Sequence, residues 1–170
     1  MRKKTALLCL TCLLFCLNAS ALADEVILTL GGDCVLGTRE EWKDDPDTFD
    51  TLIAEKGYGW CFAKIAEPFQ SDDVSLVNLE GVLQSDSQGH QRGKEFTFRG
   101  EPAYTAILSE AGIEQVNIAN NHYIDFSRDG RESTRAALEA GGIGFSGYTY
   151  RSIVEIDGYK IGFAGCRETT

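Results

Sequence analysis

Basic residues are scarce in this sequence, and histidines and prolines are scarcer still. Sixteen Lys and Arg residues stand against 26 Asp and Glu, and the 170 residues include two histidines and three prolines. The first 23 residues hold three of the basic residues and none of the acidic ones, so residues 24–170 carry a net charge of −13. This excess of carboxylates argues against binding to a nucleic-acid backbone and against charge-driven docking on anionic lipids. It is compatible with a bound divalent cation.

Two sequence patterns common in enzymes are also missing. No Gly-rich loop followed by Lys-Ser or Lys-Thr occurs, and no G-x-S-x-G motif is present. The run Gly141-Gly142-Ile143-Gly144 follows a predicted helix instead of opening one, so we interpret it as a chain reversal. Phosphate-loop and nucleophile-elbow chemistry are therefore unsupported.

The cysteines give little information about function. Three of the six lie in the first 23 residues, which leaves Cys34, Cys61 and Cys166. Three is an odd number, and the spacings match no zinc motif. In an exported protein two of them could pair, but we favour buried free thiols, which behave as small apolar residues. None has an activating neighbour in sequence, although a Cys–His nucleophile pair is left open.

Residues 6–17 form an apolar run that is too short to cross a membrane. Arg2, Lys3 and Lys4 precede it, and residues 21–23 (ALA) match a signal-peptidase cleavage pattern. We therefore expect residues 1–23 to be a secretory signal peptide and the protein to be exported. A lipoprotein signal is disfavoured because Phe15, a large residue, precedes Cys16. Residues 24–170 are about the length of one domain.

The apolar pattern predicts strands that alternate with helices. The predicted strands are 26–30, 74–77 and 115–119, and the predicted helices are 58–69, 102–111 and 130–140. Residues 153–156 and 160–164 are predicted to form a β-hairpin across residues 157–158. Residues 31–33 are a predicted turn, and residues 39–57 and 84–95 are predicted loops, the first with at most one helical turn. This order is typical of an α/β fold with a parallel sheet.

Polar residues directly follow each of the three predicted strands. They are Asp33, then Asn78 with Glu80, then residues 120–125 (NNHYID). Because the carboxyl ends of parallel strands meet at one edge of a sheet, we expect these groups to converge on a single rim. Asp33, Glu80, Asn121 and His122 offer the carboxylate, amide and imidazole groups that suit a divalent metal ion. His122 could instead act as an acid or a base, because its unperturbed pKa lies near neutrality.

Each of these residues also has an ordinary structural interpretation. Asp33 could be a turn residue, the residues after the second strand could cap the loop that they begin, and the histidine of the third segment could be structural. Asp125 or Ser127 is expected to cap the following helix, and His90 is expected to lie on the surface. Their shared placement after three strands favours a common site over these alternatives.

Three segments resemble the motifs of the bacterial capsule synthesis protein CapA family. They are residues 27–37 (ILTLGGDCVLG), residues 77–81 (VNLEG), and residues 119–122 (ANNH) followed by Asp125, Gly130, Thr134 and Leu138. The resemblance spans about residues 26–166 and rests on three ordered motifs. That family is linked to poly-γ-glutamate capsules and belongs to the metallophosphoesterase-like superfamily. The resemblance thus implies a layered α/β sandwich.

The resemblance also implies roles for single residues in a two-metal centre. Asp33 would be a metal ligand, and Glu80 or Asn78 would take the role of the second-strand acid. Asn121 would bind or bridge metal, and His122 would face the phosphoryl group or the leaving group of a substrate.

Two positions depart from the pattern that the resemblance implies. Val35 stands where the superfamily's first motif has a histidine, and Ser127 stands where the family usually has a glycine. The family continues through further strands that carry more histidines. We therefore expect residues 24–170 to be the N-terminal, incomplete part of a CapA-like domain.

The leading functional hypothesis is an exported protein that serves the synthesis, anchoring or processing of a poly-γ-glutamate-type surface polymer. Its expected partner is that anionic polymer or the machinery that makes it at the membrane, with no role for nucleic acid. One alternative is a metal-dependent phosphoesterase that acts outside the cytoplasmic membrane, and another is a non-catalytic ligand-binding module. The sequence leaves open whether the chain is catalytic, which polymer it serves and whether the metal is Mn, Fe, Zn or Mg.

Overall fold

A parallel sheet forms the centre of the computed structural model, which describes residues 25–168. Its strands are β1 (Leu28–Cys34), β3 (Val74–Leu79), β6 (Gln115–Asn117) and β7 (Gly144–Ser146), hydrogen-bonded in the order β1-β3-β6-β7. All three pairings are parallel. The predicted α/β class is therefore confirmed, whereas the predicted signal peptide, residues 1–23, lies outside the described residues.

The first strand extends further than the sequence pattern indicates. Residues 31–33, predicted as a tight turn, belong to β1, and the pairing with β3 shifts register between Leu30 and Asp33. Beyond that irregularity Asp33 lies opposite Asn78, and Cys34 lies opposite Leu79. Parallel pairing with a buried neighbour thus overrides the turn preference of the two glycines, and the shift lets the strand continue.

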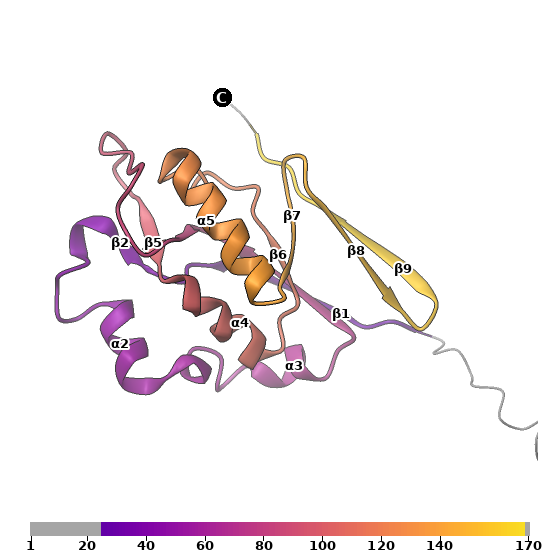
Figure 1. Ribbon diagram of the computed structural model, residues 1–170. Coiled ribbons are helices and arrows are strands. Elements are labelled where there is room, and N and C mark those ends of the chain that lie inside the picture. Colours follow the sequence, from indigo (N-terminus) through magenta and orange to yellow (C-terminus); the bar gives the residue numbers. More distant parts are fainter. Residues whose placement is uncertain (1–24, 169–170) are drawn as a thin grey trace, which may run out of the picture.

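Two helical segments cover one face of this sheet (Figure 1). The 3-10 turn η3 (Pro102–Tyr104) leads into α4 (Thr105–Ala111), which ends at Gly112 with a φ of 86°. The longer helix α5 (Ser127–Ala140) begins three residues before its predicted start. Both helices are amphipathic, and their buried side chains join those of the strands in one core that includes Ile107, Leu108, Leu138, Val77, Leu79 and Val116.

The segment between β1 and β3 differs most from the sequence-based prediction. It contains β2 (Thr38–Arg39), η1 (Glu40–Trp42), α2 (Phe49–Lys56), η2 (Tyr58–Trp60) and α3 (Ala66–Gln70). The helix α2 lies in a predicted loop, and Thr48 begins it with a capping box formed with Thr51. The single helix predicted over 58–69 is wrong. Pro68 lacks an N–H and its ring would clash with the preceding turn, so the helical segment is split in two.

Two smaller β structures complete the fold. The strands β2, β5 (Phe98–Gly100) and β4 (Val82–Leu83) form a three-stranded sheet in the order β2-β5-β4. In Figure 1 this sheet lies to the left, beyond the carboxyl end of β1. The predicted hairpin is confirmed as β8 (Arg151–Ile156) and β9 (Tyr159–Ala164), with Asp157 and Gly158 both at positive φ, as a tight hairpin turn requires.

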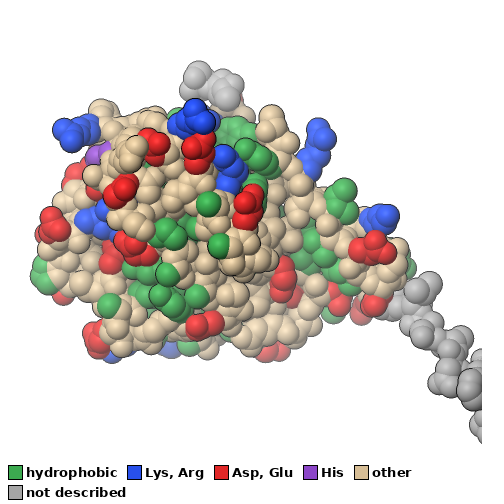
Figure 2. Space-filling view, in the orientation of Figure 1, with side chains coloured by type: hydrophobic (Ala, Val, Ile, Leu, Met, Phe, Trp, Pro, Cys, Tyr) green, Lys and Arg blue, Asp and Glu red, His purple; other side chains and the backbone are tan. Residues whose placement is uncertain are grey.

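The surface reflects the acidic composition. On the face shown in Figure 2, Asp and Glu side chains are spread over the whole surface, whereas Lys and Arg side chains lie mainly in its upper half. Among residues 25–168, no helix combines the length and the apolar character needed to cross a bilayer.

Candidate functional site at the carboxyl ends of the parallel strands

A row of polar side chains crosses the carboxyl ends of β1, β3 and β6. Asp33, Asn78 and Asn117 occupy paired positions on the three strands. Asn117 donates its Nδ2–H to Asn78 Oδ1 over 2.8 Å, and Asn78 donates to Asp33 Oδ1, also over 2.8 Å. Asn78 Nδ2 lies 3.4 Å from Glu80 Oε2 as well. The structure therefore brings the first two predicted groups of site residues together, and it adds Asn117.

The turn after β6 is held by Asn120, which sequence reasoning treated as part of a polar cluster. Its Nδ2 donates to the backbone carbonyl of Leu79 over 2.8 Å, and its Oδ1 accepts the backbone N–H groups of His122 and Tyr123. The side chain is buried. Asn120 therefore anchors this turn to β3 and fixes the position from which His122 projects.

The imidazole of His122 lies between two carboxylates. Nδ1 is 2.8 Å from Asp125 Oδ2, and Nε2 is 3.5 Å from Glu80 Oε1. The residue is buried, with 7% of its surface exposed, and its ring centroid lies 4.7 Å from that of Phe98. A carboxylate that accepts from one ring nitrogen favours the tautomer with the proton there. In that tautomer Nε2 is free to accept a proton or to bind a ligand beside Glu80.

Asp125 is not the helix cap that we expected. The cap position of α5 is Phe126, and no side chain caps that helix. Asp125 is fully buried and accepts hydrogen bonds from the Lys94 ammonium and, over 2.8 Å, from the backbone N–H of Phe98. It therefore joins His122 to two segments that are distant in sequence. The expected cap Ser127 instead donates its hydroxyl to the carbonyl of Gly89.

Lys94 is, after Asn117, a second site residue that the sequence did not indicate. Besides its ion pair with Asp125, its ammonium donates to the backbone carbonyl of Asn121 over 2.8 Å and lies 3.4 Å from His122 Nδ1. It belongs to the polar loop before β5, about 30 residues before its partners. No motif or periodic pattern marks it, so only the folded chain identifies it.

The carboxyl group of Glu80 has a pKa that is raised by its surroundings in the rim. Partial burial raises the pKa of its carboxyl group, and the neighbouring carboxyl of Asp33 raises it further, while His122 and Lys94 oppose the shift. A divalent cation between Asp33 and Glu80 would remove this repulsion. Raised carboxyl pKa values of this kind are frequent at functional sites, although structural networks also produce them.

The remaining predicted ligands fit a metal less well. Asn78 already directs its Nδ2 at both carboxylates, and its Oδ1 accepts from the amide groups of Asn117 and Asn120. The side chain of Asn121 is exposed. Within residues 25–168 no three His, Cys, Asp or Glu side chains are gathered closely enough to form a metal site. Asp33, Glu80 and Nε2 of His122 keep the chemistry of metal ligands but are not gathered around one point, and their role as ligands stays a prediction.

His90 and Thr134 both pack within the scaffold. His90, expected on the surface, is half-buried; its Nε2 lies 2.9 Å from Thr97 Oγ1, and its ring stacks on Phe126 at 5.0 Å. Thr134, from the third motif, is buried; it donates to the carbonyl of Gly130 and accepts the backbone N–H of Leu83 over 2.9 Å. These residues hold the scaffold and do not face the rim.

The three cysteines of the described segment are free thiols. Burial raises the pKa of Cys34 to about 12, with the Cys61 thiol as a smaller cause, and burial also raises the pKa of Cys61. Neither thiol is therefore activated as a nucleophile. Cys166 is exposed, contrary to the expectation of buried thiols.

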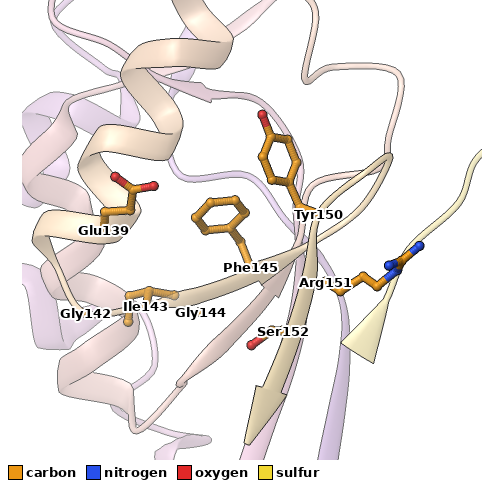
Figure 3. A pocket seen from close by; sticks show the side chains of 8 residues that line it. All are labelled: Glu139, Gly142, Ile143, Gly144, Phe145, Tyr150, Arg151 and Ser152. Carbon is orange, nitrogen blue, oxygen red and sulfur yellow. The ribbon is translucent and has the colours of Figure 1, made fainter. Parts of the chain in front are cut away.

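A separate cavity lies beside the outer strand β7. Its volume is about 360 Å³, and the residues that line it include Glu139, Phe145, Tyr150 and Arg151 (Figure 3). None of the predicted site residues lines it. This cavity therefore does not belong to the polar rim.

Comparison with known proteins adds an independent result. The family model described as "Bacterial capsule synthesis protein PGA_cap" matches residues 27–170. Proteins named "Probable polyglutamine synthesis accessory protein" from two strains of Mycobacterium tuberculosis are 28% identical to this chain over 145 residues. The match covers 71% of this chain and 38% of each relative, so the chain spans well under half the length of these relatives. The match over nearly all of the described residues confirms the resemblance seen in the three motifs: the chain belongs to the bacterial capsule synthesis protein PGA_cap family.

Proposed function

We propose that this protein is exported and serves the synthesis, anchoring or processing of a polyglutamate-type capsular polymer outside the cytoplasmic membrane. Its family membership and the names of its relatives support a role in capsule synthesis. The structural observation that carries the proposal is the orientation of His122 by the buried carboxylate of Asp125, with Nε2 directed at Glu80. An imidazole held in this way is suited to moving a proton at a bound substrate.

Deletion and complementation of the gene test this role. Cells that lack the gene should carry less surface polymer, measured by quantifying glutamate after hydrolysis of washed cells. The wild-type gene should restore the polymer, and H122A should not. D44N provides a control, because Asp44 is an exposed acid that takes no part in the hydrogen bonds of the rim. Equal protein levels are checked by immunoblot, and an unchanged amount of polymer after deletion would refute the proposal.

A metal-dependent phosphoesterase is the second candidate, and the raised pKa of Glu80 beside Asp33 favours it. Asp33, Glu80 and His122 would hold the cation, which when bound would acidify a water molecule and polarise a phosphoryl oxygen. His122, oriented by Asp125, would then face the substrate. Asn121 and Asn78, the other predicted ligands, would need a different side-chain arrangement to contribute.

Metal analysis and turnover decide between these candidates. Purified protein is dialysed against Mn, Fe, Zn or Mg ions, its metal content is measured, and a panel of phosphate esters is tested at neutral pH. A phosphoesterase should retain at least one metal and lose it in the D33N/E80Q variant. Absence of both metal and hydrolysis would dismiss this candidate. Weaker polymer binding by H122A, with no turnover in the wild type, would instead indicate a non-catalytic binding module.

A further inference from the structure

A second surface cavity, of about 450 Å³, lies next to the polar rim. It opens between β2, η1, the start of α2 and β5, and four aromatic side chains line it: Trp42, Phe49, Phe96 and Phe98. Small-molecule sites are commonly concave, of this size, and lined by aromatic rings with a few polar groups. None of the predicted site residues lines this cavity, so the sequence did not indicate it.

Two of these rings are unusually accessible. Trp42 is 50% exposed and Phe96 is 45% exposed. The guanidinium carbon of Arg39 lies 4.5 Å from the ring centroid of Trp42 and 4.6 Å from that of Phe96. Arg39 also donates from Nη2 to the carbonyl of Glu95 over 2.8 Å. The cation therefore holds two exposed rings at the mouth of the cavity, where a ligand can reach their apolar surface.

The charges around the cavity restrict the kind of ligand. Asp45 and Asp47 line it together with Arg39. The carboxylates disfavour an anionic ligand. A cationic ligand would have to displace the guanidinium of Arg39, which is already stacked on both rings and lies 3.6 Å from Glu41. A purely apolar ligand would remove these charged groups from water without giving them partners, which is costly. Hydroxyl groups satisfy both kinds of charge, since they donate to carboxylates and accept from a guanidinium.

The cavity and the rim lie on either side of Phe98. Arg39 and Phe98 are opposite each other in the β2–β5 pair. Phe98 lines the cavity, its ring lies 4.7 Å from the ring of His122, and its backbone N–H is bonded to Asp125. One side chain thus separates the cavity from the imidazole. A ligand held in the cavity would lie beside the rim.

We propose that this cavity binds a neutral saccharide unit, whose C–H face would stack on Trp42 and Phe96 while its hydroxyl groups bond to Asp45, Asp47 and Arg39. This inference goes beyond the function proposed above and does not depend on catalysis or on a metal. Binding of the saccharide requires no role of His122 in turnover.

Tryptophan fluorescence tests the proposal, because the chain has two tryptophans, Trp42 and Trp60. In W60F, titration with cellobiose, maltose or N,N′-diacetylchitobiose should change the emission of Trp42 in a saturable way for at least one disaccharide. Trp60 is 49% exposed and does not line the cavity, so W42F provides a matched control whose emission should stay constant. Triglutamate and tetramethylammonium serve as the anionic and cationic probes.

Substitutions of residues that line the cavity test whether the disaccharide binds there. In the W60F background, F96A should weaken disaccharide binding at least tenfold, and D45N/D47N should weaken it severalfold. Circular dichroism checks that each variant is folded, and saturation-transfer NMR on the wild-type chain measures binding without any substitution. The proposal is overturned if no disaccharide binds by either method, if the charged probes bind more tightly, or if folded F96A binds as well as its parent.

Discussion

Asp125 Oδ2 lies 2.8 Å from His122 Nδ1, and this carboxylate is fully buried. The same carboxyl group accepts the ammonium of Lys94 and the backbone N–H of Phe98. These partners satisfy the hydrogen-bonding capacity of a carboxyl group that has no access to water. The pair therefore connects the stability of the loop before β5 with the orientation of the candidate catalytic imidazole.

We expect D125N to destabilise the protein by about 3 kcal/mol, since it leaves the Lys94 ammonium without its buried counter-charge. Urea unfolding followed by circular dichroism measures the change. D44N, which alters an exposed acid, should change the free energy of unfolding by less than about 0.5 kcal/mol. A D125N variant as stable as D44N would show that the buried network contributes little.

Lys94 and Asp125 should act as one unit. We expect K94M alone to cost about 2 kcal/mol, because a hydrogen bond to a charged group is lost and the carboxylate stays buried. In the K94M/D125N double variant the costs should fall short of their sum by at least about 1 kcal/mol. Strict additivity in the double-mutant cycle would mean that the two side chains do not interact in solution.

The close contact between β5 and the segment before β2 depends on a glycine. A Cβ at Gly100 would lie 1.8 Å from the carbonyl oxygen of Leu36 and 2.9 Å from Tyr104 Cδ2. We expect G100A to cost about 3 kcal/mol, because backbone must move to admit the methyl group. Gly162, also in a strand, has no atom within 4 Å of such a Cβ, so G162A is the matched control. Equal melting temperatures for the two variants would contradict this packing.

The thiols should differ strongly in reactivity. Burial raises the pKa of Cys34 to about 12, which lowers the fraction of reactive thiolate at pH 8, and burial raises the pKa of Cys61 as well. Exposed Cys166 should therefore be alkylated by iodoacetamide first, as peptide mass spectrometry will show. In urea the three rates should converge. Native Cys34 reacting as fast as Cys166 would contradict its burial.

Much of the fold followed from local patterns. Gly112 ends α4, and the Asp157-Gly158 pair turns the β8–β9 hairpin, both as expected from residues that tolerate positive φ. The alternation of apolar strands and helices predicted the parallel sheet. The short strands β2, β4, β5 and β7 were not predicted, because two or three residues carry too little periodic signal.

The candidate site was predictable only in part, because some of its residues are marked by no local sequence pattern. The sequence by itself placed Asp33, Glu80 and His122 at one edge, because the polar residues after parallel strands must meet there. It could not distinguish Asp125 as a helix cap from Asp125 as a partner of His122. Neither Lys94 nor the aromatic cavity was visible, since both depend on loops brought together by long-range pairing. Local propensity therefore determined the scaffold and the place of the rim, and tertiary packing alone decided which charges and rings surround it.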